Sequence, residues 1–281
     1  MKAIDFHVHQ RTGDRVQGGE QWRQARQLFK VGEESVDLVE YYASRDMRAV
    51  VFDVDAETTD GMRACNDSIA ELAERSEGVL IGFATVDPWK GKAALDELDR
   101  CREMGLRGLK IQPVTQQLRL NERRFSPLWE YCQAHQLPVL VHTGTTGIGA
   151  GSPGGGGYKL DYGRPVPYLD DVASEFPDLT LIAAHFGWPW YLEALAVARH
   201  KSNVYIDLSG WSPKYFPAEV VKYFQSVIPD KFLFGSDFPL LTPDRWLAEF
   251  DELGTKASSR EAILYGNACR VLGLDVPTEV R

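Results

Sequence analysis

Eight short apolar runs, each followed by a longer segment with a helical pattern, constrain the fold of this chain more than any other feature. The runs cover residues 2–6, 49–53, 79–85, 108–111, 138–142, 180–185, 204–208 and 231–235. The helical segments lie near residues 35–44, 62–75, 91–104, 127–135, 168–176, 191–200, 217–227 and 243–253. Short apolar runs that alternate with helices are typical of parallel strands buried on both faces, and so predict an α/β protein.

Eight such units in 281 residues favour a closed (β/α)8 TIM barrel over an open sheet. A doubly wound sheet would need a phosphate-binding turn after its first strand, and the sequence has none. Residues 258–272 predict one extra C-terminal helix. No repeat or linker divides the chain, so we expect a single domain over residues 1–281. Two long loops, 10–34 and 144–167, follow predicted strands one and five.

Charge and composition limit the classes of partner that this protein can have. The formal net charge is -9 with the acidic residues spread along the chain, which argues against a nucleic-acid partner. No apolar run is long enough to cross a bilayer, and no signal peptide precedes the first strand. The four cysteines form no CxxC pair and read as reduced thiols. We therefore expect a cytoplasmic protein that acts on a small molecule, and a homo-oligomer is compatible with the sequence.

The residues that end the predicted strands are the candidates for chemistry, because barrel active sites lie at the carboxyl ends of the strands. Read in chain order, they are His7, His9, Asp53, Asp55, Asp87, Lys110, His142, His185, Asp207 and Asp237. Four of the six histidines of the chain belong to this set.

His7 and His9 stand two residues apart, so both side chains point to one face of an extended segment. If that face is the barrel interior, two neutral imidazoles converge on one point, which suits zinc or a similar divalent ion. A pair of surface histidines at a strand end is the alternative, and the motif alone does not decide between them.

His142, His185 and Asp237 strengthen the metal interpretation. A single histidine at a strand end is usually structural, but here four histidines end three strands of one predicted barrel. Asp237 could be only a turn or cap residue before Phe238 and Pro239. Barrel closure places it beside the first strand, where it can bind metal and accept a proton from metal-bound water.

With these residues the sequence resembles the amidohydrolase superfamily, in its amidohydrolase-related (amidohydrolase 2) branch. That branch includes proteins similar to aminocarboxymuconate-semialdehyde decarboxylase and to 4-hydroxyphenyl-β-ketoacyl-CoA hydrolases. The resemblance covers nearly the whole chain and runs through residues 5–9, 108–113, 139–144, 184–187, 203–211, 233–239 and 265–274.

The resemblance implies that His7, His9, His142 and Asp237 bind one divalent metal, usually zinc, and that His185 is catalytic or orients the substrate. Several aromatic decarboxylases of the superfamily begin with Glu-x-His, whereas this chain has His-x-His. Two-metal members use a carboxylated lysine on strand four. The residues around Lys110 resemble the one-metal form instead.

Four residues near the predicted strand ends are candidates for substrate binding. Arg164 could clamp a carboxylate or form a structural ion pair. Lys110 faces the same end of the barrel, and Trp188 and Trp211 could wall an aromatic pocket or serve as packing. The glycine-rich segment 144–157 lacks the ending of a P-loop and reads as an active-site loop or a plain surface loop. Asp53, Asp55 and Asp207 read as residues that cap helices or orient other side chains.

The sequence therefore predicts a mononuclear metal-dependent hydrolase that acts on a small oxo or carboxylic substrate, with an aromatic β-keto compound as one candidate. Asp237 would be metal ligand and general base, and His185 would stabilise an oxyanion or deliver a proton. Non-oxidative decarboxylation by the same residues is the alternative. A non-catalytic metal-binding barrel is the third interpretation.

Overall fold

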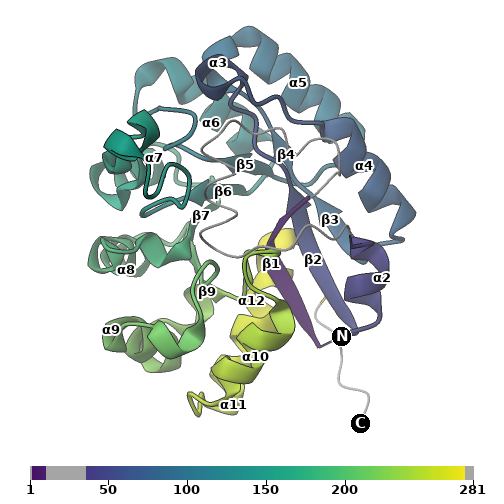
Figure 1. Cartoon of the computed structure of the whole chain (residues 1–281), viewed down its shortest axis with the longest axis vertical. Coiled ribbons are helices and arrows are strands. Elements are labelled where there is room, and N and C mark those ends of the chain that lie inside the picture. Colours follow the sequence, from purple (N-terminus) through teal and green to yellow (C-terminus); the bar gives the residue numbers. More distant parts are fainter. Residues whose placement is uncertain (1, 11–35, 276–281) are drawn as a thin grey trace.

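A computed structural model describes residues 2–10 and 36–275, and its strands form a barrel wall with helices around the outside (Figure 1). The strands are β1 (Ala3–His9), β2 (Met47–Phe52), β3 (Leu80–Gly82), β4 (Ala84–Thr85), β5 (Leu109–Ile111), β6 (Val139–His142), β7 (Leu181–Ala184), β8 (Val204–Asp207) and β9 (Phe232–Leu233). The predicted run 79–85 is interrupted at Phe83, so β3 pairs with β2 and β4 pairs with β5. All eight predicted strands are therefore present.

Hydrogen bonds between the first and last strands close the barrel. β1, β2 and β3 pair in parallel, as do β4 to β9 in chain order. The Phe6 amide donates to the Phe234 carbonyl at 2.8 Å, and the His9 amide donates to the Phe238 carbonyl at 2.9 Å. These bonds confirm the predicted TIM barrel and bring residues 6–9 beside residues 234–238.

The helices follow the predicted order. They are α2 (Leu38–Ala43), α4 (Asn66–Arg75), α5 (Lys92–Glu103), α6 (Ser126–Ala134), α7 (Asp170–Glu175), α8 (Tyr191–His200), α9 (Ala218–Lys222) and α10 (Pro243–Asp251). The predicted closing helix consists of α11 (Ala257–Glu261) and α12 (Asn267–Leu272), joined by the π-helical turn Ala262–Gly266. Helix α4 begins four residues later than predicted, and the short helix α3 (Glu57–Asp60), which the sequence did not predict, precedes it.

Part of the barrel interior is filled by an apolar cluster. Ile4, Phe6, Val50, Phe52, Ile81, Phe83, Leu140, Ile182 and Leu233 belong to one buried cluster. Helix α12 adds Ala268, Cys269 and Leu272 to the same cluster. The barrel is therefore filled by side chains in this part, and the C-terminal helix packs against that filling.

An irregularity in β1 lets two kinds of side chain share the interior. The pairing of β1 with β2 shifts register between Asp5 and Val8. Phe6 belongs to the interior cluster, and the ring of His7 also lies inside, 4.9 Å from the ring of Phe52. In a regular strand two consecutive side chains point to opposite faces, so the shift is what allows Phe6 and His7 to point the same way.

Of the two long loops, segment 144–167 is folded into short 3-10 turns, Pro153–Gly157 and Leu160–Gly163. The predicted loop 10–34 falls almost wholly outside the described residues. Cys101, Cys132 and Cys269 are buried on helices as free thiols, and Cys65 is a half-buried free thiol. Within the described ranges, no helix combines the length and apolar character needed to span a membrane.

Candidate metal centre

Three of the predicted residues form a compact group at the carboxyl ends of the strands. His7 lies near the end of β1, two positions before its final residue His9. His185 directly follows β7, and Asp237 lies four residues after β9. One ligand atom from each of His7, His185 and Asp237 lies within 4.8 Å of the others. The side chain of His7 is fully buried and that of Asp237 is 13% exposed. Two imidazoles and a carboxylate at this spacing form a potential site for a divalent metal ion.

His9 and His142 flank this group. The Nε2 atom of His9 lies 3.2 Å from Oδ1 of Asp237, and Nδ1 of His142 lies 3.1 Å from Nε2 of His185. The other ring nitrogen of His142 is 3.1 Å from the carbonyl oxygen of Thr145. The rings of His7 and His9 both lie 4.9 Å from the ring of Phe52, so they share one face as predicted. That His9 and His142 bind the metal stays a prediction.

Lys110, on β5, lies in the wall of the same site. Its Nζ is 3.3 Å from Nε2 of His7 and 4.8 Å from the centre of the Phe52 ring. The side chain is almost fully buried, and burial lowers its pKa to about 8 although Asp237 and Asp207 act in the opposite direction. A lysine in this position can contribute a positive charge toward a bound anion; its predicted role in substrate binding stays a prediction.

The electrostatics of the site favour neutral imidazoles and an ionised carboxylate. Burial lowers the pKa of His185 to about 4, and it holds the pKa values of His7 and His142 well below their usual range. Burial alone would raise the pKa of Asp237, but the hydrogen bond from His9 and nearby positive charges leave it lowered. Metal ligands must be deprotonated, so these protonation states fit a bound divalent cation.

The backbone at two of these residues adopts a rare conformation. His185 has φ of 59° and Asp237 has φ of 66°, both in the left-handed region. Asp237 is held there by its amide, which donates to the His7 carbonyl at 2.9 Å. Non-glycine residues in this region are uncommon and are concentrated at functional sites. At both residues the chain changes direction just after its strand has ended.

Asp207 and Ser209 belong to the site, although the sequence predicted only a capping or orienting role for Asp207 and no role for Ser209. Oδ2 of Asp207 lies 2.6 Å from Nδ1 of His7 and accepts a hydrogen bond from Ser209 Oγ at 2.6 Å. Ser209 Oγ lies 3.0 Å from Nδ1 of His185. Of the two predicted alternatives, Asp207 therefore orients another side chain. The spacing Asp-Leu-Ser after a strand was the available signal for Ser209.

Asp5 organises the other side of β1, a role that the sequence did not predict. Its fully buried carboxylate accepts hydrogen bonds from the hydroxyls of Tyr42 and Ser236, at 2.8 and 2.5 Å. It also accepts from the amides of Ser236 and His7. Burial raises the pKa of Asp5 to about 6, against the effect of these bonds. Asp5 therefore ties β1 to the residue that precedes Asp237.

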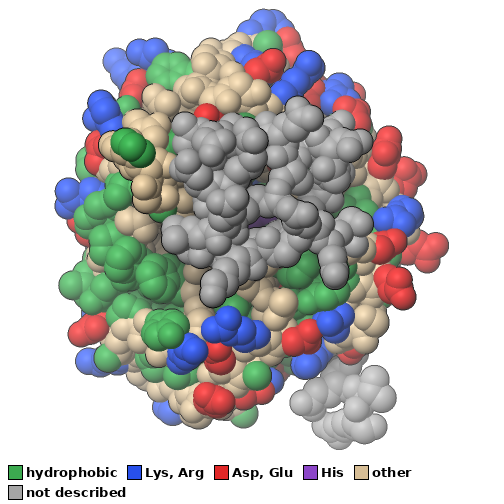
Figure 2. All heavy atoms as spheres, viewed as in Figure 1, with side chains coloured by type: hydrophobic (Ala, Val, Ile, Leu, Met, Phe, Trp, Pro, Cys, Tyr) green, Lys and Arg blue, Asp and Glu red, His purple; other side chains and the backbone are tan. Residues whose placement is uncertain are grey.

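The remaining predicted residues lie toward the surface. Arg164 forms an ion pair with Glu193 at 2.5 Å, which is the structural alternative considered for it, and its role as a substrate clamp stays a prediction. The rings of Trp188 and Trp211 lie side by side, 4.7 Å apart. Several large apolar side chains are exposed on the segments after β6, β7 and β8: Leu160, Val166, Trp188, Leu192 and Tyr215. Figure 2 shows hydrophobic side chains gathered over α8 on the left of the molecule.

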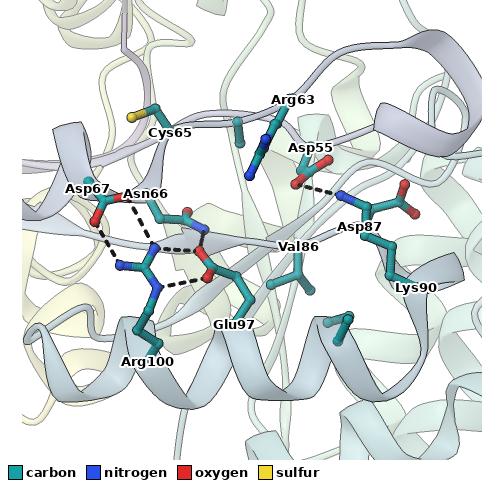
Figure 3. Close-up of a pocket in the computed structure, with 13 residues that line it drawn as sticks. Asp55, Arg63, Cys65, Asn66, Asp67, Val86, Asp87, Lys90, Glu97 and Arg100 are labelled. Carbon is teal, nitrogen blue, oxygen red and sulfur yellow. Dashed lines mark hydrogen bonds and ion pairs between the residues drawn. The ribbon is translucent and has the colours of Figure 1, made fainter.

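A cavity of about 600 Å³ lies elsewhere, beside α4 and α5 (Figure 3). It is lined by charged side chains, including Asp55, Arg63, Lys90, Glu97 and Arg100, and by none of the predicted metal ligands or substrate-binding residues. Many of these charges are already paired, as Arg100 is with Glu97 and Asp67. Burial raises the pKa of Asp55 to about 6. Among the described residues, His7, His185 and Asp237 are the group whose ligand atoms lie close enough together to hold a metal ion, so the histidine group is the candidate site.

Comparison with known proteins identifies the family of this chain. The amidohydrolase family model matches residues 4–274, which is nearly the entire chain. The chain belongs to the amidohydrolase family. No curated protein matches the sequence. For an amidohydrolase, metal-assisted hydrolysis and decarboxylation are the reactions to consider.

Solved structures with low sequence identity share the fold of this amidohydrolase. An uncharacterized TIM-barrel protein from Bordetella bronchiseptica has 23% identity and a TM-score of 0.80, covering 97% of this chain and 99% of that one. The 5-carboxyvanillate decarboxylase of Sphingomonas paucimobilis has 16% identity and a TM-score of 0.71, with 98% and 99% covered. A probable 2-pyrone-4,6-dicarboxylic acid hydrolase from Acinetobacter baumannii has 14% identity and a TM-score of 0.65, with 98% and 100% covered.

Proposed function

We propose that this amidohydrolase is a mononuclear zinc-dependent hydrolase of a small oxo or carboxylic substrate, with an aromatic β-keto compound as the first candidate. The observation that carries the proposal is the group of His7, His185 and Asp237, whose ligand atoms lie within 4.8 Å of one another. A divalent ion held there would supply Lewis acidity toward a carbonyl and toward a bound water. We include His9 and His142 in the ligand set because each lies within 3.2 Å of a member of the group.

The chain's own residues would divide the remaining work. Asp237 is ionised at neutral pH, so it can accept a proton from the attacking water. His185 is neutral; its Nε2 lies toward Nδ1 of His142, and its Nδ1 lies toward the hydroxyl of Ser209. The Lys110 ammonium can stabilise negative charge on the substrate, and Trp188 and Trp211 can exclude water from an aromatic ring.

Non-oxidative decarboxylation is the second candidate, and Lys110 is the observation that favours it. A buried cation beside His7 is suited to hold a substrate carboxylate. The related decarboxylase structure has the same fold, although the fold by itself does not fix the reaction. The His-x-His motif of β1 weighs toward hydrolysis.

A metal and product analysis tests the proposal. The purified protein would be stripped with a chelator, reconstituted with Zn²⁺, and screened against β-keto acids, lactones and hydroxybenzoates in ¹⁸O-labelled water. Hydrolysis places ¹⁸O in a product, whereas decarboxylation releases CO2 without incorporating water into the organic product. Release of CO2 alone would replace the hydrolase by the carboxy-lyase. Absence of bound metal, together with no change in the His7→Ala variant, would overturn both.

The proposed location and assembly follow from the same interpretation. We infer a cytoplasmic enzyme whose partner is a small-molecule substrate, and a homo-oligomer stays a prediction.

A further inference from the structure

We propose that Asp207 and Ser209 are positioning residues that together fix the Nδ1–H tautomers of His7 and His185. Both residues are fully buried at the end of β8. One carboxylate oxygen, Oδ2 of Asp207, contacts Nδ1 of His7 at 2.6 Å and Oγ of Ser209 at 2.6 Å. Ser209 Oγ in turn contacts Nδ1 of His185 at 3.0 Å. A single carboxylate therefore reaches two imidazoles, one directly and one through a hydroxyl.

The number of available protons sets the direction of each hydrogen bond. Lys110 favours the ionised form of Asp207, and an ionised carboxylate only accepts, so the bond between His7 and Asp207 needs a proton on Nδ1 of His7. Ser209 has one hydroxyl proton and donates it to Asp207, so its oxygen is left to accept from Nδ1 of His185. The hydrogen bond at one ring nitrogen fixes the tautomer of a neutral imidazole. In both rings Nε2 is then the unprotonated nitrogen.

The surroundings of His7 agree with this assignment. Nε2 of His7 is 3.3 Å from Nζ of Lys110, which is a donor only, so the lysine needs a lone pair at that nitrogen. Nε2 of His185 faces Nδ1 of His142 at 3.1 Å. A neutral His142 donates from one nitrogen only, so it bonds either to His185 or to the Thr145 carbonyl at one time.

Two glycines leave the space that this arrangement occupies. A Cβ atom on Gly235 would lie 2.1 Å from Oδ1 of Asp207, which is far inside van der Waals contact. A Cβ atom on Gly210 would lie 2.5 Å from Nδ1 of His185. The Ser209 amide also donates to Oδ1 of Asp207 at 3.0 Å, which holds the carboxylate plane. The backbone is thus shaped around the carboxylate and the imidazole.

The consequence for the site is that Asp207 and Ser209 together set the tautomers of His7 and His185, which are two of its three central residues. Histidines that bind metals donate their other ring N–H to a carboxylate or carbonyl, and loss of that partner costs about 10–100-fold in metal affinity or activity. Asp207 would act on metal affinity through His7, whereas Ser209 would act on His185 alone. The expected effect on metal affinity rests on the proposed function, whereas the tautomer assignment does not.

The tautomers can be measured directly in the metal-free protein. Long-range ¹H–¹⁵N correlation spectra of protein labelled at its six histidines distinguish Nδ1–H from Nε2–H rings. We expect His7 and His185 to be Nδ1–H in the wild type, with signals assigned from single histidine variants. Ser209→Ala should move His185 toward Nε2–H and leave His7 unchanged, and Asp207→Asn should change both rings. Ser209→Thr, which keeps the hydroxyl, should restore the wild-type signal of His185.

Ser76→Ala is the matched control, because Ser76 is also a buried serine with hydrogen bonds, at the end of α4, but it contacts no histidine. It should leave both histidine signals unchanged. An Nε2–H signal from His185 in the wild type would overturn the proposal without any variant. The same holds if Ser209→Ala folds and leaves the His185 signal as it was.

A zinc titration of the same proteins separates this proposal from the proposed function. We expect Asp207→Asn, which changes both rings, to weaken Zn²⁺ binding by about 10–100-fold, and Ser209→Ala, which changes His185 alone, to weaken it less. If the wild type binds no zinc but shows both Nδ1–H signals, the proposed function fails and the tautomer assignment stands. Equal loss of affinity in both variants would contradict the separate roles of Asp207 and Ser209.

Discussion

The two halves of the barrel interior are built from opposite chemistry. In one half, side chains such as Phe6, Phe83 and Leu140 form a fully buried apolar cluster. In the other half, toward the carboxyl ends of the strands, ionisable groups occupy equally buried positions, among them His7, Lys110 and Asp207. In β6 the change occurs within two residues, from Leu140 to His142.

This difference separates the sources of stability and of chemistry. The apolar half gains free energy from burial and close packing. Burial in the ionisable half disfavours every charged form: it lowers the pKa of Lys110 and His185 and acts to raise the pKa of Asp207, which Lys110 and the bonds from Ser209 oppose. Such groups persist there because they are hydrogen-bonded to one another, and they are available for catalysis because their pKa values are displaced. Variants in the two halves should therefore fail in different ways.

The largest expected effect is on turnover, from a change in the ionisable half. Asp237→Asn removes the proposed base while retaining shape, so we expect kcat to fall by about 10²–10⁴-fold on the substrate found by the screen. Far-UV circular dichroism and thermal unfolding should show a folded protein. Retained activity would show that Asp237 is not the general base. An unfolded variant would show that the ionisable half is also needed for the stability of the fold.

A change in the apolar half should instead reduce stability. The ring of Phe83 packs edge-on against Phe6 at 5.8 Å and fills the space left by Gly108, where a Cβ would lie 2.4 Å from the ring. Phe83→Ala should lower the free energy of unfolding by about 3–5 kcal/mol, measured by urea denaturation. Zinc affinity of the folded variant should be unchanged. A loss of zinc affinity as large as that of His7→Ala would show that the two halves are not independent.

The smallest effect is a difference in pH dependence between the two halves. The pKa of His185 is about 4 in the folded protein, against an ordinary value of 6.5. Between these values the unfolded chain binds a proton that folded His185 does not, so stability falls as the pH falls through this window. From pH 7 to pH 4, the wild type should lose about 2–3 kcal/mol relative to His185→Gln, measured by urea denaturation in the presence of chelator.

Ile182→Val, in β7 and three residues before His185, is the control for this measurement. It should lower stability by about 0.5–1.5 kcal/mol by the same amount at both pH values, since no ionisable group is removed. If the free energies of unfolding of the wild type and His185→Gln also differ by the same amount at both pH values, the imidazole of His185 is not desolvated in the folded protein.

Much of the fold could be predicted from the chain because each strand and helix carries its own local pattern. The apolar runs located all eight strands, with errors confined to ends and to the break at Phe83. Helix α3 was missed because four residues are too few for a periodic pattern. The gathering of His7, His185 and Asp237 could be expected once the barrel was inferred, because closure brings the last strand beside the first.

The partners inside the site could not be predicted in the same way. The spacing Asp-Leu-Ser is the only local signal for Ser209, and it does not reveal the partner; the contact with His185 depends on the neighbouring strand and on the space at Gly210. Arg164 could have bound substrate or another side chain, and only the position of Glu193 on α8 decides that it forms an ion pair.

The sequence by itself determined the barrel and the kinds of metal ligand that end its strands, because strand patterns and residue types are properties of short segments. The tertiary structure alone decided that Phe6 and His7 share the interior, through the register shift in β1. It also decided that one carboxylate, Asp207, serves both His7 and Ser209. The physical reason is that hydrogen-bond distance, burial and pKa depend on atoms 200 residues apart in the chain, which only the closed barrel brings together.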